Sequence, residues 1–100
     1  MIKHIVMWKL QENAEGRTKE ENARLLKEKL EALKGQIEEI RYLEVGININ
    51  DSDSSYDAVL ITEFETMEKL NSYQVNPKHQ AVSAFVSKIR EERAVVDFEF

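Results

Sequence analysis

The sequence is poor in the residues that cross-link or interrupt a polypeptide chain. Its 100 residues include no cysteine, one proline and three glycines. The absence of cysteine excludes disulfide bonds and metal sites built on thiolates. No apolar run approaches the roughly 20 residues that a membrane-spanning helix needs. The N-terminus also lacks the long apolar region of a secretory signal peptide, so we expect an intracellular, cytoplasmic protein.

Charge of one sign is not concentrated in any part of the sequence. The chain has 14 Lys and Arg against 19 Asp and Glu, which gives a net charge of -5. The basic residues are scattered and form no stripe, which argues against a nucleic-acid partner and against an anionic membrane surface. Glycine-rich phosphate loops, serine nucleophile elbows and helical zinc motifs are absent, so no cofactor is predicted.

The sequence does contain an ordered series of strand and helix patterns. Strands are predicted at 2–10, 40–50, 56–65 and 93–100. A helix is predicted from Thr18, where Glu21 completes a capping box, to a stop near Gly35. A second helical region starts at Thr66, is interrupted at Pro77 and continues to about 91.

This β-α-β-β-α-β order predicts a single α+β domain over residues 1–100. Two strand-helix-strand halves form a four-stranded antiparallel sheet with helices on one face. A strand order of 4-1-3-2 places the first and third strands in the middle, which agrees with their apolar centres on both faces. The sheet face away from the helices would carry Ile5, Met7, Val59 and Ile61. Such an apolar patch indicates an interface, so we expect a homodimer through the open sheet face.

His4 and Asp97 are the first candidate site residues. The fourth strand runs antiparallel beside the first, which brings the end of one next to the start of the other. Asp97 would then orient the imidazole of His4. The alternative is a partly buried histidine that a neighbour satisfies and that has no chemical role.

Tyr73 and His79 flank the break at Pro77 and form the second candidate group. The interruption could open a cavity in which both polar tips meet. A histidine near neutral pKa can move a proton, and a tyrosine hydroxyl can donate to a carbonyl. The alternative is a core tyrosine beside a surface histidine.

Two further patterns are weaker. Asp51 and Asp53 are spaced as metal ligands, but no further ligands follow, and no metal site is predicted. Trp8, Tyr42 and Tyr56 are either pocket-lining aromatics or ordinary core residues.

Taken in order, several short segments closely resemble the stress-responsive dimeric A/B barrel (Dabb) family. They are Lys3-His4-Ile5-Val6, Glu63-Phe64-Glu65, Tyr73, Asn76-Pro77-Lys78-His79 and Val96-Asp97-Phe98. The resemblance covers nearly the whole chain, although Asn76 stands where the family commonly has a histidine. It implies a ferredoxin-like fold that pairs through its sheet faces into a dimeric α/β barrel.

The resemblance also implies residue roles. A plant polyketide cyclase of this family uses a tyrosine and a histidine as an acid–base pair, and these match Tyr73 and His79. The histidine of its first strand matches His4. The expected ligand pocket is lined by Val6, Trp8, Leu60 and Asp97.

Three functions therefore stay open. The first is a homodimer with a small-ligand pocket and no chemistry of its own. The second is a cyclase-like acid–base enzyme acting on a carbonyl compound through His79 and Tyr73. The third is a cofactor-free monooxygenase, since similar barrels do that work. Trp8 bears on the first two, because its bulk on the pocket side could fill the cavity.

Overall fold

The computed structural model describes residues 1–100 and is built around a four-stranded antiparallel sheet. In sheet order the strands are β4 (Tyr42–Ile47), β5 (Ala58–Phe64), β1 (Ile2–Leu10) and β6 (Arg90–Glu99). The two strands with apolar centres on both faces, β1 and β5, occupy the middle. The predicted strand order is confirmed.

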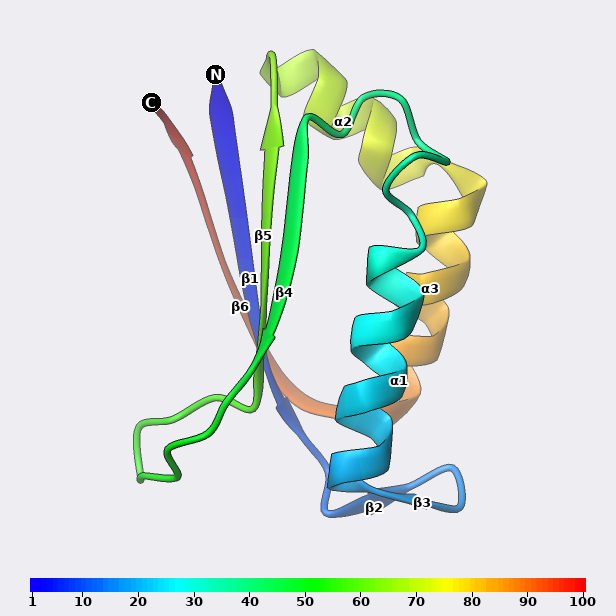
Figure 1. The fold of residues 1–100 in the computed structure, drawn as a ribbon, viewed down its shortest axis with the longest axis vertical. Helices are drawn as coiled ribbons and strands as arrows, with labels where there is room; N and C mark the ends of the chain where they lie inside the picture. Colours follow the sequence, from blue (N-terminus) through cyan, green and yellow to red (C-terminus); the bar gives the residue numbers. More distant parts are fainter.

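Three helices cover one face of the sheet, and the other face is open (Figure 1). They are α1 (Lys19–Glu31), α2 (Met67–Val75) and α3 (Pro77–Ile89). The two chain ends lie side by side, where the backbone N–H of Phe100 donates to the carbonyl oxygen of Met1 at 3.0 Å. This is the predicted ferredoxin-like α+β fold. No helix in it combines the length and the apolarity needed to cross a bilayer.

The core lies between the helices and the inner face of the sheet. Every second residue of β1 and of β5 is buried, as the period of two in a strand requires. Leu26 and Leu30 of α1 and Ile89 of α3 close the core from the helix side. Each fully buried side chain of this kind contributes about 1.5–3 kcal/mol relative to an exposed one.

The helix starts follow the local sequence signals. Thr18 and Glu21 form the predicted capping box, in which each side chain accepts the backbone N–H of the other. Asn76 caps α3 by accepting the backbone N–H of Lys78 at 2.9 Å, and Pro77 fills the first helical position. The break at Pro77 therefore separates α2 and α3 without leaving the start of α3 unsatisfied.

The predicted loop between the first strand and the first helix contains a small hairpin instead. Its strands are β2 (Asn13–Ala14) and β3 (Arg17–Thr18), joined by a turn of two residues. Both turn residues have positive φ, 53° at Glu15 and 75° at Gly16. Tight hairpins favour this geometry, but glutamate in place of the usual asparagine or aspartate hides the signal in the sequence.

Two predicted boundaries also differ from the structure. Helix α1 ends at Glu31, four residues before the expected stop at Gly35. Tight i→i+3 turns continue the chain, so that Leu33 still reaches the core. Strand β6 begins at Arg90, directly after α3. The sequence pattern instead predicts that the helix continues to about 91 and that the strand starts at 93.

The open face of the sheet is apolar along its centre. Ile5 pairs with Ile61 and Met7 with Val59, and all four side chains are only half-buried. The edge strand β6 extends the patch with exposed apolar residues on the same face, of which Val96 opposes Ile5. The exposed apolar residues of this patch are Val96, Phe98 and Phe100.

Candidate functional site

A cavity of about 270 Å³ lies between β1 and α3. From the sheet, β1 contributes His4, Val6 and Trp8, and β5 contributes Leu60. From the helix layer, α3 contributes His79 near its start. The other lining residues are Leu30, Val82, Ser83, Val86, Ser87, Arg90 and Arg93. Trp8 is almost fully buried and forms part of the wall, so it narrows the cavity without filling it.

His4 is held from both sides by the sheet. Asp97 is its register partner on β6, and the Nδ1–H of His4 donates to that carboxylate. On β5, the hydroxyl of Thr62 donates to the carbonyl oxygen of His4 at 3.3 Å. With Nδ1 committed to Asp97, the ring nitrogen that remains for chemistry is Nε2. Asp97 itself does not line this cavity. It borders a separate depression near the chain ends.

His79 owes its position to the interruption at Pro77. Its Nδ1 lies 3.1 Å from the carbonyl oxygen of Gln74, in the last turn of α2. A carbonyl only accepts, so Nδ1 carries the hydrogen and the neutral ring keeps its lone pair on Nε2. Burial lowers the pKa of His79 below its ordinary value, and the neighbouring His4 and Arg93 act in the same direction. The hydrogen bond to Gln74 opposes this shift only in part.

Tyr73 lies behind His79 rather than in the cavity wall. Its ring centroid is 4.3 Å from that of His79 and 4.9 Å from that of Phe64. The side chain is fully buried, and its hydroxyl has no hydrogen-bond partner. Burial raises the pKa of Tyr73 well above its ordinary value, so the hydroxyl stays protonated. A buried hydroxyl without a partner is uncommon and calls for a structural or functional explanation.

The structure therefore brings together most of the sequence candidates. His4, Val6, Trp8 and Leu60 line one cavity with His79. Sequence patterns did not indicate Arg90 and Arg93, because both fall at the transition between a helix and a strand. No periodic signal marked them. Their place in the cavity depends on how β6 pairs with β1.

Metal-ligand geometry is not found elsewhere in the molecule. Asp51 and Asp53 lie exposed in the segment that joins β4 to β5. No three histidine, aspartate or glutamate side chains are grouped closely enough to hold a metal ion. The aromatic candidate Tyr42 is exposed on the edge strand β4.

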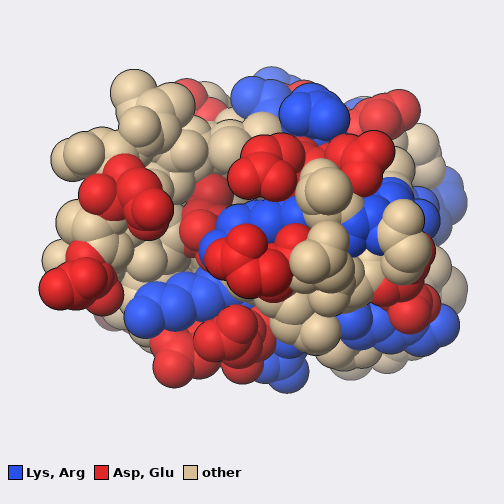
Figure 2. Space-filling model, turned by 90° about the horizontal axis from the view of Figure 1, so that it is seen from below, with Lys and Arg blue, Asp and Glu red and all other residues tan.

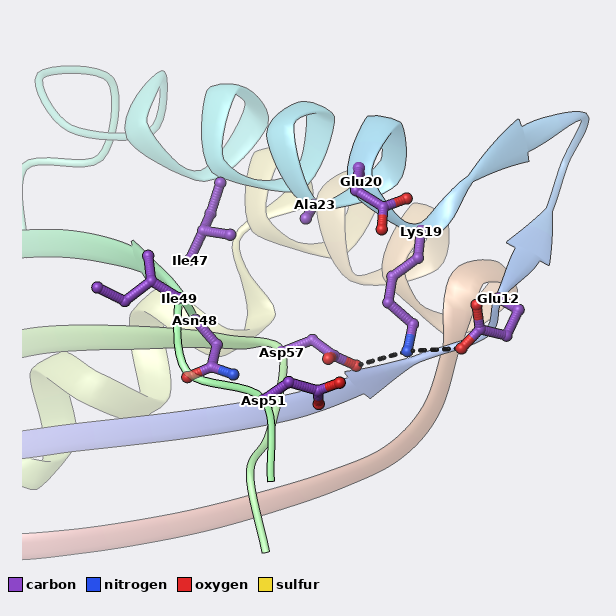
Figure 3. A pocket seen from close by; sticks show the side chains of 9 residues that line it. All are labelled: Glu12, Lys19, Glu20, Ala23, Ile47, Asn48, Ile49, Asp51 and Asp57. Carbon is purple, nitrogen blue, oxygen red and sulfur yellow. Dashed lines mark ion pairs between the residues drawn. The ribbon is translucent and has the colours of Figure 1, made fainter. Parts of the chain in front are cut away.

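A second cavity, of about 330 Å³, lies beside the start of α1 (Figure 3). Here the Nζ of Lys19 lies 3.1 Å from an oxygen of Glu12 and 3.6 Å from an oxygen of Asp57. Partial burial opposes the charge of Lys19, but these two carboxylates outweigh it and raise its pKa. The face in Figure 2 shows the same balance, with basic and acidic groups interspersed. The one basic side chain that lines the second cavity, Lys19, is therefore paired within the chain.

Comparisons with known proteins agree with this fold. The sequence matches the stress responsive A/B barrel domain over residues 2–100. It is 33% identical to an uncharacterised protein of Streptomyces coelicolor, over the full length of both chains. A dimeric protein of unknown function with a ferredoxin-like fold, from Bacteroides fragilis, is 34% identical. That structure superposes with a TM-score of 0.84, covering 99% of this chain and 95% of the other.

A more distant structure shares the fold alone. The hydroxynitrile lyase of Passiflora edulis is 11% identical and superposes with a TM-score of 0.78. The match covers 97% of this chain and 90% of the lyase. The fold is thus common to proteins of unknown function and to an enzyme, while the family follows from the match over residues 2–100. This chain belongs to the stress responsive A/B barrel domain family.

Proposed function

We propose that the protein is a homodimer in which each subunit binds a small molecule between its sheet and α3. The cavity of about 270 Å³ carries this proposal. The cavity reaches into the core, because two of its lining residues, Val6 and Trp8, are only 1% and 5% exposed. Half of its 12 lining residues are apolar, and a small-ligand site usually combines apolar side chains with a few convergent polar groups. At roughly 30 Å³ per water, its volume corresponds to about nine water-sized groups, which favours a small ligand.

The open sheet face supports the homodimer. Val96 and Phe98 are 58% and 42% exposed there, next to the half-buried Ile5 and Ile61. Contiguous exposed apolar surface of this kind marks an interface. The Bacteroides fragilis relative, at 34% identity, is described as dimeric. Pairing two such faces would bury the apolar side of both sheets.

Sedimentation equilibrium tests the homodimer. The wild type is expected at about twice the 11.7 kDa chain mass at micromolar concentration. Val96→Glu places a charge on the open face and should give a monomer. Val75→Glu is the matched control, because Val75 is 67% exposed on α2, away from that face. A monomeric wild type, or equal loss of the dimer in both variants, would contradict this assembly.

Fluorescence and thermal shift test the ligand site. Trp8 is the only tryptophan and lines the cavity, so its emission reports binding there. A panel of small carboxylic acids and carbonyl compounds should include members that change this emission and raise the melting temperature. Ser83→Phe at the cavity should abolish both effects, whereas Ser72→Phe on α2 should preserve them. A panel without any responding compound would count against a ligand site.

Acid–base catalysis is the second candidate function, and the two histidines favour it. His4 and His79 both line the cavity, and each has its Nδ1 committed to an acceptor. In the proposed step, the Nε2 lone pair of neutral His79 takes a proton from the carbon beside a carbonyl. The C–H bond breaks, an N–H bond forms, and the electron pair moves onto the carbonyl oxygen as an enolate. Tyr73 packs on the His79 ring and acts as a positioning residue.

Proton exchange tests this step without knowledge of the product. NMR would follow the exchange of α-protons for deuterium in a carbonyl compound that binds the cavity. His79→Gln should slow the catalysed exchange by about 100-fold or more. Gln80→Ala, an exposed neighbour on α3, should leave it unchanged. An exchange rate equal to that in plain buffer would remove the enzyme proposal and leave the binding proposal standing.

A further inference from the structure

Two arginines stand at the rim of the cavity. Arg90 and Arg93 are both exposed and both line it, at the start of β6. From the sheet, Val6, Trp8 and Leu60 contribute apolar lining beside His4. The cavity therefore combines apolar side chains of the sheet with two cationic side chains.

A shift in strand pairing puts both guanidinium groups on the same side. Residues three apart in a regular strand point to opposite faces. Here Trp8 pairs with Arg93, while Leu10 pairs with Arg90, because the register shifts after Lys9 and leaves Glu91 without a partner. Paired residues of antiparallel strands share a face, so Arg90 and Arg93 both lie on the side of the buried Trp8 and Leu10. Bulges next to binding sites commonly re-aim a side chain in this way.

Neither guanidinium is satisfied within the chain. The ion pairs of the structure use Lys3, Lys9, Lys19, Lys27, Arg41 and His4 as their basic members. Arg90 and Arg93 take part in none of them, and their side chains donate no hydrogen bond to the protein. Glu92, although it lies between them, pairs with Lys9 on the other face of the strand. Two unpaired cations therefore converge on one opening.

We propose that Arg90 and Arg93 recognise a carboxylate, so that the ligand of this cavity is a small organic acid with an apolar body. This inference rests on the proposed function, because it takes the cavity to be the ligand site. The planar guanidinium donates two parallel hydrogen bonds that match the two oxygens of a carboxylate. The apolar part of the acid would lie along Val6, Trp8 and Leu60.

Trp8 fluorescence with a matched pair of probes tests the proposal. Hexanoate and hexanamide have the same shape and differ in charge. The wild type should bind hexanoate about tenfold or more tightly than hexanamide, since charged hydrogen bonds are the stronger ones. Arg90→Gln combined with Arg93→Gln should remove this preference. Lys88→Gln, an exposed cation of α3 that does not line the cavity, should retain it.

The remaining outcomes separate this inference from the proposed function. Equal binding of both probes, abolished by Ser83→Phe, would overturn the carboxylate preference and keep the ligand site. A preference for hexanoate that survives in the double arginine variant would assign the charge recognition elsewhere and also overturn the inference. No response to either probe would contradict both proposals. The melting temperature of the double variant, expected to equal that of the wild type, confirms that lost binding is not lost folding.

Discussion

Two cavities beside the helices differ in how their basic side chains are paired. In the cavity at the start of α1, Lys19 sits between Glu12 and Asp57, and its charge is matched by the chain itself. In the cavity between β1 and α3, Arg90 and Arg93 have no carboxylate partner. Charges that are matched internally hold elements together, whereas unmatched ones are free for a ligand. Cavity volume, at about 330 and 270 Å³, does not distinguish the two.

The largest effect is expected at the cavity beside α1, where Asp57 pairs with Lys19. Asp57→Ala should lower the free energy of unfolding by about 2 kcal/mol, because the buried backbone N–H of Leu10 loses its 2.7 Å acceptor. Urea denaturation measures the change. Asp51→Ala, at an exposed carboxylate that lines the same cavity, is the control and should be neutral. Equal stability of the two variants would contradict a stabilising role of the Asp57 side chain.

A smaller effect of opposite sign is expected at Tyr73, which lies behind the cavity between β1 and α3. Tyr73→Phe removes a buried hydroxyl that has no partner, so it should raise the free energy of unfolding by about 1 kcal/mol. Tyr42→Phe offers a matched comparison, because the hydroxyl of Tyr42 is exposed and donates to Glu44 at 2.9 Å. That variant should show no gain. A loss of stability in Tyr73→Phe would mean that the hydroxyl has a partner in solution.

His79 should make the stability of the protein depend on pH between about 7.5 and 5. Burial lowers its folded-state pKa, so the folded protein holds the ring neutral while the unfolded chain protonates near pH 6.5. The stability from this group is fully present above about pH 6.5 and is lost as the pH falls toward the lowered folded value. Denaturation curves between pH 7.5 and about 5 should show this loss, and His79→Gln should make the profile flatter. An identical profile in the variant would remove His79 as the cause.

The smallest effect is expected where charges are unmatched. Arg90→Gln and Arg93→Gln together should change the free energy of unfolding by less than about 0.5 kcal/mol, since neither side chain bonds to the protein. Thermal unfolding without ligand measures this. A loss of stability near that of Asp57→Ala would show that the two arginines stabilise the fold. The two cavities would then not differ in this respect.

Much of the fold could be predicted from short-range patterns. The alternation along β1 and β5 reflects a period of two that packing cannot alter without exposing the core. The capping box at Thr18 and the start of α3 at Pro77 are also local, since each depends on residues within one turn. The hairpin at Glu15 could not be predicted, because its turn uses a residue that rarely adopts positive φ.

The candidate site was only partly predictable, for a different reason. His4, Tyr73 and His79 carry recognisable side chains at interpretable spacings, so they could be selected in advance. The depth of Tyr73 and the separation of Asp97 from the cavity depend on packing between layers. Arg93 had no sequence signal, because its direction depends on the pairing of β6 with a strand more than 80 residues earlier.

The sequence by itself determined the element order, the buried faces and the identity of the two histidines. These depend on side-chain type and local period, which are written along the chain. The tertiary structure alone decided that a cavity remains beside Trp8, that His79 keeps its Nε2 lone pair, and that Arg90 and Arg93 share one face. Each of these depends on the register between distant segments, and a shift of one residue there turns a side chain from one face of the sheet to the other.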